Sequence, residues 1–248
     1  PKVRLKYRNK ARAEKRKRAM RLTRSDVMQL AHARQLWKTP EWGLLNGTNM
    51  RGLEEIEELH GLKEKKIKNG KPVVEGSGFI GFLGALRRRF PEQVIQVLDE
   101  GPGLSSFKPE LLSEAEKKFG AHTVRIETSD ILPAPSKEAH VEATPEELVK
   151  RFGRNRFHLI VSTYGGMSYS MLHPLIGLSN IVAVLKEGGE ARRLITANTF
   201  RGDYAWGKAV EKLRKLHPHI IVKIVENTFE VRNPKRHTAS NFYITIQK

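Results

Sequence analysis

The segment VIQVLDEGPGLSSF, residues 94–107, constrains the fold more than any other stretch of the chain. A run of apolar residues ends in an acid, Asp99, and two glycines follow at Gly101 and Gly103. Short apolar runs bounded by turn residues are typical of buried strands. Glycine lets the backbone turn sharply and approach a ligand closely, where a side chain would clash. The segment therefore predicts a buried strand, a tight loop and then a helix.

From residue 77 onward, strand patterns alternate with helix patterns, which is typical of α/β proteins. The expected strands cover residues 94–99, 122–127, 157–163, 191–199, 219–232 and 240–248. The expected helices cover residues 77–90, 108–119, 144–152 and 204–217, with one or two more in 167–187 that end at Gly188-Gly189. The polar, Pro-rich segment 128–143 is expected to be a loop.

Residues 1–24 form a polybasic arm. They contain twelve Lys or Arg and one acid, Glu14, so the arm carries +11 of the chain's formal charge of +18. Like charges at this density repel each other, and a polyphosphate partner would remove that repulsion and release counterions. We expect RNA binding by this arm rather than a merely solvated tail. The basic residues are Lys2, Arg4, Lys6, Arg8, Lys10, Arg12, Lys15, Arg16, Lys17, Arg18, Arg21 and Arg24.

Residues 25–76 are expected to form a helical extension between the arm and the main domain, residues 77–248. Ser25-Asp26 is a helix-cap signal that precedes apolar residues at helical spacing. Trp37 and Trp42 could stack on bases, or they could pin the extension to the main domain. A second amphipathic helix is expected over residues 51–70, ending at Asn69-Gly70.

The chain has no cysteine, which excludes disulfides, thiolate metal sites and cysteine nucleophiles. This fits a reducing compartment, and we expect a cytoplasmic protein, with a mitochondrial one as the alternative because the N-terminus is Arg-rich. No stretch reaches the roughly 18 apolar residues of a membrane span, so no membrane partner is expected. Apart from His217-Pro218-His219, which we interpret as a turn, the histidines show no metal-ligand spacing.

The motif Asp99-Glu100-Gly101-Pro102-Gly103, the strand and helix order and the two closing strands resemble the class I (Rossmann-like) methyltransferases that use S-adenosylmethionine (SAM). The resemblance covers roughly residues 77–248. It implies an α/β fold: a Rossmann-like methyltransferase sheet with helices on both faces and an antiparallel C-terminal hairpin, here preceded by a basic helical extension. A dinucleotide fingerprint would have a third glycine where this chain has Ser106.

The resemblance also implies site residues. The acid Asp99 would face the cationic, amine-bearing end of SAM, and Gly101 and Gly103 would let the loop approach it. An acid at the end of the second strand binds the ribose in this family, and Glu127 follows Gly103 by 24 positions. Asp130 would meet the adenine amine; if residues 122–130 were instead the third strand, Glu127 would lose its ribose role.

At the end of the fourth strand, the resemblance places Ser162 and Thr163 near the cofactor and Tyr164 on the substrate side. The sequence departs from the family in two places. Only one strand is evident between the first strand and residues 157–163, where the family has two, so either the sheet has lost a strand or HTVRIETSDIL does both jobs. Ser162 to Gly166 also lacks the Asn/Asp-Pro-Pro-aromatic motif of base N-methylation. His158 and His173 could act as bases, but both are interpreted as structural.

Two functions fit these observations. One is a SAM-dependent methyltransferase that acts on RNA, structured or ribosomal, whose arm docks on that RNA. The other is a non-catalytic, methyltransferase-like RNA-binding protein, such as a ribosomal or ribosome-assembly component. In both cases the expected partner is RNA, in the ribosome or a pre-ribosomal particle.

The arm generates a direct prediction. RNA affinity should fall steeply with salt concentration, and deletion of residues 1–24 should reduce the slope of log K against log [salt] by roughly one for each phosphate that the arm neutralises. Filter binding or fluorescence anisotropy over roughly 50–200 mM salt measures the slope. A slope that is the same with and without the arm would contradict RNA binding by these residues.

Overall fold

The computed structural model describes residues 52–68, 71–102, 107–130, 140–163, 173–196, 204–229 and 239–248. The polybasic arm, the helix expected after Ser25 and the two tryptophans Trp37 and Trp42 lie outside these residues, so the expectations for them remain predictions.

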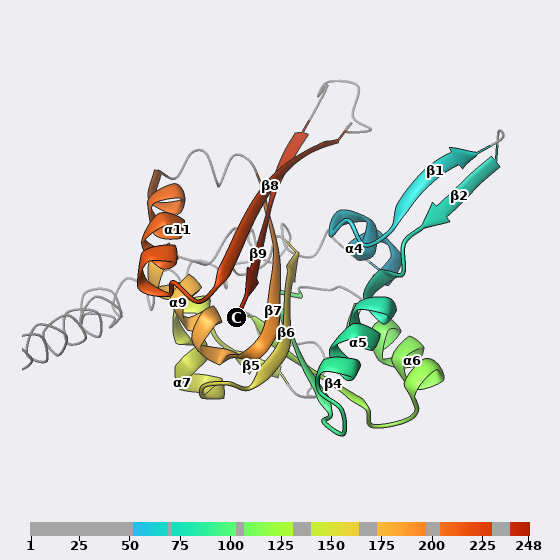
Figure 1. The fold of residues 1–248 in the computed structure, drawn as a ribbon, viewed down its shortest axis with the longest axis horizontal. Helices are drawn as coiled ribbons and strands as arrows, with labels where there is room; N and C mark the ends of the chain where they lie inside the picture. The colour runs from blue at the N-terminus through green and yellow to red at the C-terminus, as the bar shows by residue number, and fades with distance from the viewer. Residues whose placement is uncertain are drawn as a thin grey trace, which may run out of the picture.

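A seven-stranded sheet organises the chain (Figure 1). Its strands are β3 (Ile95–Glu100), β4 (Val124–Asp130), β5 (His140–Glu142), β6 (Phe157–Thr163), β7 (Leu185–Thr196), β8 (Ile221–Phe229) and β9 (Ala239–Gln247). The order across the sheet is β5-β4-β3-β6-β7-β9-β8. The first five strands in that order are parallel, and β9 runs antiparallel to both β7 and β8. This confirms the predicted Rossmann-like methyltransferase sheet with an antiparallel C-terminal hairpin.

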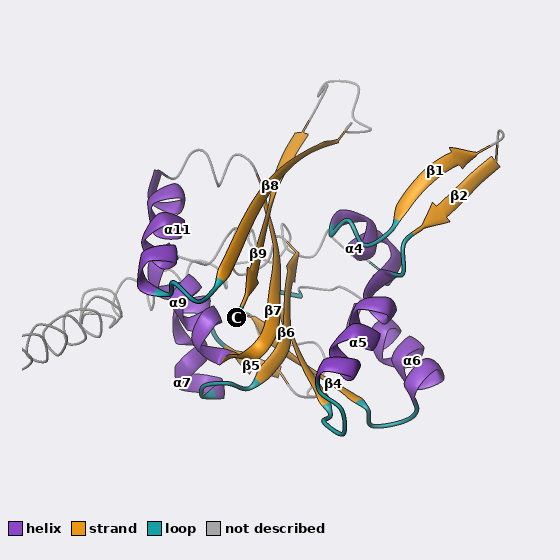
Figure 2. Cartoon of the chain, viewed as in Figure 1, coloured by secondary structure: helices purple, strands orange, loops and turns teal. Residues whose placement is uncertain are grey.

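Helices cover both faces of the sheet, as predicted (Figure 2). One layer contains α4 (Leu53–Leu59), α5 (Gly78–Arg89) and α6 (Phe107–Phe119), and the face beneath it is here called the α6 face. The other layer contains α7 (Leu148–Phe152), which follows a 3-10 turn (Pro145–Glu147), α9 (Pro174–Val184) and α11 (Tyr204–Leu216); its face is the α9 face. Within the described part of the chain, no helix has the length and apolarity to cross a bilayer.

Alternate residues of the central strands supply two hydrophobic clusters, because successive side chains of a strand point to opposite faces. On the α6 face, Val97 and Val161 pack with Phe79 of α5 and Leu111 of α6. On the α9 face, the cluster joins four helix and strand segments through Leu98, Ile160, Leu178 and Trp206. Strands of a parallel sheet that is buried on both faces are expected to be largely apolar, and the middles of β3 (Val97, Leu98) and β6 (Leu159 to Val161) are.

Two expectations around the sheet are wrong. His140 to Glu142 forms the short strand β5 within the segment predicted as a loop, so the sheet has its third strand after all. A strand of three residues is too short to show a recognisable alternation of apolar and polar side chains in the sequence. Strand β7 begins at Leu185 and runs through Gly188-Gly189, which therefore lie inside the strand and do not end a helix. A Cβ at Gly189 would lie only 2.9 Å from the Lys186 carbonyl oxygen, which explains the glycine.

The helix expected over residues 51–70 is also wrong. Helix α4 ends at Leu59, Gly61 follows with a positive φ of 63°, and the chain enters the hairpin of β1 (Glu64–Lys68) and β2 (Lys71–Glu75). Lys68 pairs with Lys71, so only Asn69-Gly70 separates the strands, and this dipeptide is typical of two-residue hairpins. The hairpin belongs to a separate two-stranded sheet and extends away from the main one (Figure 1).

The core on the α9 face gives a prediction for stability. Trp206 of α11 is 1% exposed, so Trp206→Ala should lower the free energy of unfolding by about 3–5 kcal/mol because it removes a large buried side chain and leaves a cavity. Urea denaturation measures this loss. Lys212→Ala, at an exposed position of the same helix, is the control and should change stability by less than about 0.5 kcal/mol. Equal effects of the two substitutions would contradict this packing.

Candidate cofactor-binding site

The strand order reverses between β3 and β6, which lie side by side in the sheet although β4 and β5 come between them in the chain. The connection after β3 leads to one side of the sheet and the connection after β6 leads to the other. In open α/β sheets this reversal leaves a crevice at the carboxyl ends of the strands, where ligands bind. The predicted site residues Asp99, Asp130 and Thr163 lie at those strand ends.

On the α6 face, two carboxylates lie near each other at the ends of adjacent strands. Asp99 of β3 is paired in register with Thr128 of β4, and Asp130 lies two residues further along β4, on the same face as Thr128. Asp99 is only 5% exposed, and its Oδ2 has no hydrogen-bond partner among the described residues. Buried polar atoms are normally hydrogen-bonded, so this orphaned oxygen marks a position suited to a ligand group that donates or is positively charged.

The surroundings of Asp99 oppose its negative charge. Burial and the nearby charge of Asp130 raise the pKa of Asp99 to about 7, and Lys108 at the start of α6 opposes this only in part. A cationic group beside Asp99 would offset both the burial of its charge and the repulsion from Asp130. The amine and the sulfonium of SAM are such groups, so the residues present fit this cofactor.

The loop after β3 begins in the conformation that its glycine allows. Gly101 has φ of 68°, in the left-handed region that residues with a Cβ adopt at a cost. Its N–H donates to the carbonyl oxygen of Ser129 at 2.7 Å, which continues the β3–β4 hydrogen bonding past the end of β3. Gly103, the second glycine of the motif, lies outside the described residues.

Strand β4 extends three residues beyond its expected end, so Asp130 and not Glu127 is its last residue. Glu127 pairs in register with Leu98, whose side chain belongs to the α9 face. Its carboxylate accepts a hydrogen bond from Arg156 Nη2 at 2.6 Å. The structure therefore brings Asp99 and Asp130 together on one face and places Glu127 on the other, in an ion pair.

Ser162 and Thr163 are consecutive, so their side chains point to opposite faces of β6. Ser162 lies on the α9 face and is fully buried, whereas Thr163 lies on the α6 face, the same face as Asp99. Thr163 Oγ1 and His60 Nε2 are 2.8 Å apart and hydrogen-bonded. Tyr164, the residue predicted on the substrate side, lies outside the described residues.

His60 is a residue near the site that sequence reasoning missed. It directly follows α4 and is buried against the rings of Phe79 and Tyr243. Burial, with a smaller contribution from the charge of Arg192, lowers the pKa of His60 to about 3, so the imidazole is neutral at physiological pH. A lone histidine within a charged segment carries no sequence signal for this contact.

Of the two histidines considered as bases, His158 has a structural role, as the sequence indicated. His158 lies near the start of β6, at the opposite end of the strand from the site; its Nδ1 accepts from the backbone N–H of Gln96 at 2.9 Å. Burial lowers the pKa of His158 to about 4. The backbone N–H of His173 donates to the carboxylate of Glu146 at 2.8 Å just before α9 begins.

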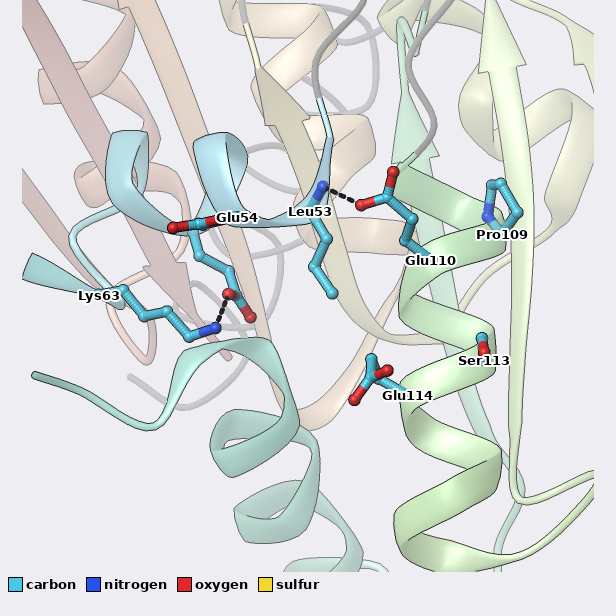
Figure 3. A pocket seen from close by; sticks show the side chains of 8 residues that line it. Leu53, Glu54, Lys63, Pro109, Glu110, Ser113 and Glu114 are labelled. Carbon is cyan, nitrogen blue, oxygen red and sulfur yellow. Dashed lines mark hydrogen bonds and ion pairs between the residues drawn. The ribbon is translucent and has the colours of Figure 1, made fainter. Parts of the chain in front are cut away.

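A separate pocket of about 470 Å³ lies between α4 and α6 (Figure 3). Its lining is mainly acidic and includes none of the predicted site residues. Glu110 of α6 accepts a hydrogen bond from the backbone N–H of Leu53 at 2.6 Å, and so caps the N-terminus of α4 from a neighbouring helix. Lys63 forms an ion pair with the buried Glu57 at 2.5 Å. Two of the pocket's carboxylates therefore have structural roles: Glu110 joins α6 to α4, and Glu57 is paired with Lys63.

Comparisons with known proteins give the following. No protein-family model matches the sequence, and no curated protein matches it. A TehB-like SAM-dependent methyltransferase from Corynebacterium glutamicum aligns over 66% of this chain and 85% of its own, at 16% identity and a TM-score of 0.38. A SAM-dependent methyltransferase from Archaeoglobus fulgidus aligns over 70% and 95%, at 13% identity and 0.42. TrmN from Thermus thermophilus aligns over 68% and 48%, at 14% identity and 0.36. These identities and TM-scores are too low to support an argument from the aligned proteins, so the fold is assigned from the strand order of this chain.

The raised pKa of Asp99 predicts how stability depends on pH. The folded pKa of about 7 exceeds the unfolded value of about 3.9, so the folded state binds more protons between these values and stability falls as pH rises through that window. Asp99→Asn should remove this loss. It should be more stable than wild type by a few kcal/mol at pH 8 and about equally stable near pH 4.

Urea denaturation across this pH range measures the effect. Glu116→Gln, at an exposed position of α6, should leave the pH dependence as in wild type. A stability difference between Asp99→Asn and wild type that is the same at every pH would contradict the assigned titration.

Proposed function

We propose that this protein is a SAM-dependent methyltransferase that acts on RNA, structured or ribosomal. The observation that carries the proposal is the pair Asp99 and Asp130 at the reversal of strand order, beside a glycine with positive φ. One carboxylate of this pair is buried with an unpartnered oxygen. This arrangement suits a ligand that is cationic at one end and bears ribose hydroxyls at the other.

In this proposal the chain's residues hold and orient the reactants. Asp99 accepts from the cationic, amine-bearing end of the cofactor, and Gly101 lets the backbone approach it. Asp130, as the last residue of β4, takes the ribose-binding role that the resemblance assigned to Glu127. SAM, when bound, supplies an electrophilic methyl group on its sulfonium. Thr163 leads into the segment with Tyr164, which would place the acceptor against that methyl group.

Methyl transfer of this kind needs little acid–base chemistry from the protein. Holding the two reactants in line can supply much of the rate acceleration. His158 has structural contacts at the far end of β6, and His60 is too weak a base at physiological pH, which fits a mechanism based on proximity.

The RNA substrate is inferred from charge. The formal charge of +18 and the arm of residues 1–24 suit a polyanionic partner, either the ribosome or a pre-ribosomal particle. Lack of cysteine suits a reducing compartment, and we infer the cytoplasm.

A non-catalytic RNA-binding protein on the same scaffold is the second candidate. The specific observation in its favour is the sequence that follows Thr163, which lacks the acceptor-positioning motif of base N-methylation. Under this alternative the basic arm would carry the function, and the cofactor site would be a remnant of the fold.

Calorimetry with SAM separates the two candidates. Wild type should bind SAM with micromolar affinity, and Gly101→Val should abolish binding because a β-branched residue does not adopt a φ of 68° without strain. Because the cation favours ionised Asp99, affinity should rise about tenfold from pH 6 to pH 8, and Asp99→Asn should remove this rise. No SAM binding in a folded wild-type protein would leave the non-catalytic candidate.

A further inference from the structure

Four polar side chains lie side by side across the α9 face of the sheet, directly below the carboxyl ends of the strands. Ser129 pairs in register with Glu100, and Ser162 pairs with Arg193. Asp99 pairs with Val161, so the next residues along, Glu100 and Ser162, are also neighbours. The four residues form one row, and each is at most 1% exposed.

The row contains one ion pair, between Glu100 of β3 and Arg193 of β7. These strands are not neighbours, because β6 lies between them. The arginine side chain must therefore pass over β6 to reach the carboxylate. It passes at Ser162, whose small side chain leaves room on the buried face.

Neither charge could stay buried without the other. Taking an ionised group out of water is costly unless a partner of opposite charge compensates it. Burial lowers the pKa of Arg193 well below its ordinary value, which shows how fully the guanidinium is withdrawn from solvent. Within the described residues, neither the Arg193 guanidinium nor the Glu100 carboxylate has a hydrogen-bond partner, so the ion pair is the contact that fixes both groups.

The position of the pair relates it to the cofactor loop. Glu100 is the last residue of β3 and directly precedes Gly101, where the backbone turns into the loop. Asp99, on the other side of Glu100 in sequence, points to the opposite face. Fixing the Glu100 side chain from the α9 face therefore fixes the direction in which the Asp99 side chain points on the other face, and the backbone from which Gly101 turns into the loop.

We propose that Arg193 is a positioning residue that acts through Glu100 to hold the start of the cofactor loop in its binding conformation. This deepens the proposed function and rests on it. A purely stabilising role explains the pair less well, because apolar residues of similar volume often stabilise a core as much as a buried ion pair does. Replacing both partners together therefore separates positioning from stability.

The decisive variant is the double substitution Glu100→Leu with Arg193→Met, which removes both charges and keeps similar volumes. We expect a melting temperature within about 5 °C of wild type, since no charge is left unpaired. We also expect at least a tenfold loss of SAM affinity by calorimetry and faster amide hydrogen exchange over residues 98–102 without ligand. Glu114→Leu with Lys117→Met, which removes both partners of an exposed ion pair on α6 away from the loop, is the matched control and should change neither SAM affinity nor this exchange.

The readouts distinguish the possible failures. A folded double variant with wild-type SAM affinity and wild-type exchange over residues 98–102 would overturn the positioning role. If wild type does not bind SAM, the proposed function fails, and exchange still decides the positioning role: faster exchange in the double variant supports it and unchanged exchange overturns it.

If the double variant does not fold, Arg193→Lys takes its place, since a lysine keeps the charge but lacks the guanidinium fork. At a wild-type melting temperature, faster exchange in Arg193→Lys supports the role and unchanged exchange overturns it.

Discussion

The architecture depends on β3, the strand that has a parallel neighbour on each side and a helical layer on each face. From Val97 onward the side chains of this strand are buried, so polar residues there can occur only where something else satisfies them. After Val97 and Leu98, β3 ends with two acids in succession, one toward each face. Asp99 faces a second carboxylate on the α6 face, and Glu100 faces an arginine on the α9 face. The two acids thus meet opposite conditions: one is destabilised as an anion and the other is compensated.

The two acids therefore have different roles: Asp99 is suited to bind a ligand, and Glu100 supports the end of β3. A carboxylate whose surroundings oppose ionisation gains most from a cationic ligand, whereas a carboxylate that already has its cation is fixed in place. His60 makes a comparable contribution on the other side, because it holds the last residue of β6 by a hydrogen bond and stays neutral. The strand ends that form the candidate site are therefore held from both helical layers, and the orphaned oxygen of Asp99 remains for a ligand.

Sequence reasoning predicted the elements whose patterns are long and regular. The apolar runs of β3 and β6 and the glycine motif predicted the class of sheet. The Thr144-Pro145 signal predicted the helical turn before α7, where the Glu147 carboxylate accepts a hydrogen bond from the Thr144 backbone N–H. Short or interrupted elements were missed. β5 has three residues, and α4 has seven before the chain turns into a lysine-rich hairpin whose spacing resembles that of a charged helix. Contacts between distant residues were also missed, because Glu100 and Arg193 are 93 positions apart and register alone brings them together.

The place of α4 in the structure has a consequence for how such a chain can be divided. Leu53 and Ile56 belong to the same hydrophobic cluster as α5, α6 and the central strands, and Glu110 of α6 caps the first turn of α4. Helix α4 is therefore part of the main hydrophobic core and not a separate extension. Removing it would expose Phe79 and Leu111 to water. A fragment meant to keep the α6-face core intact should therefore include residues from 52 onward.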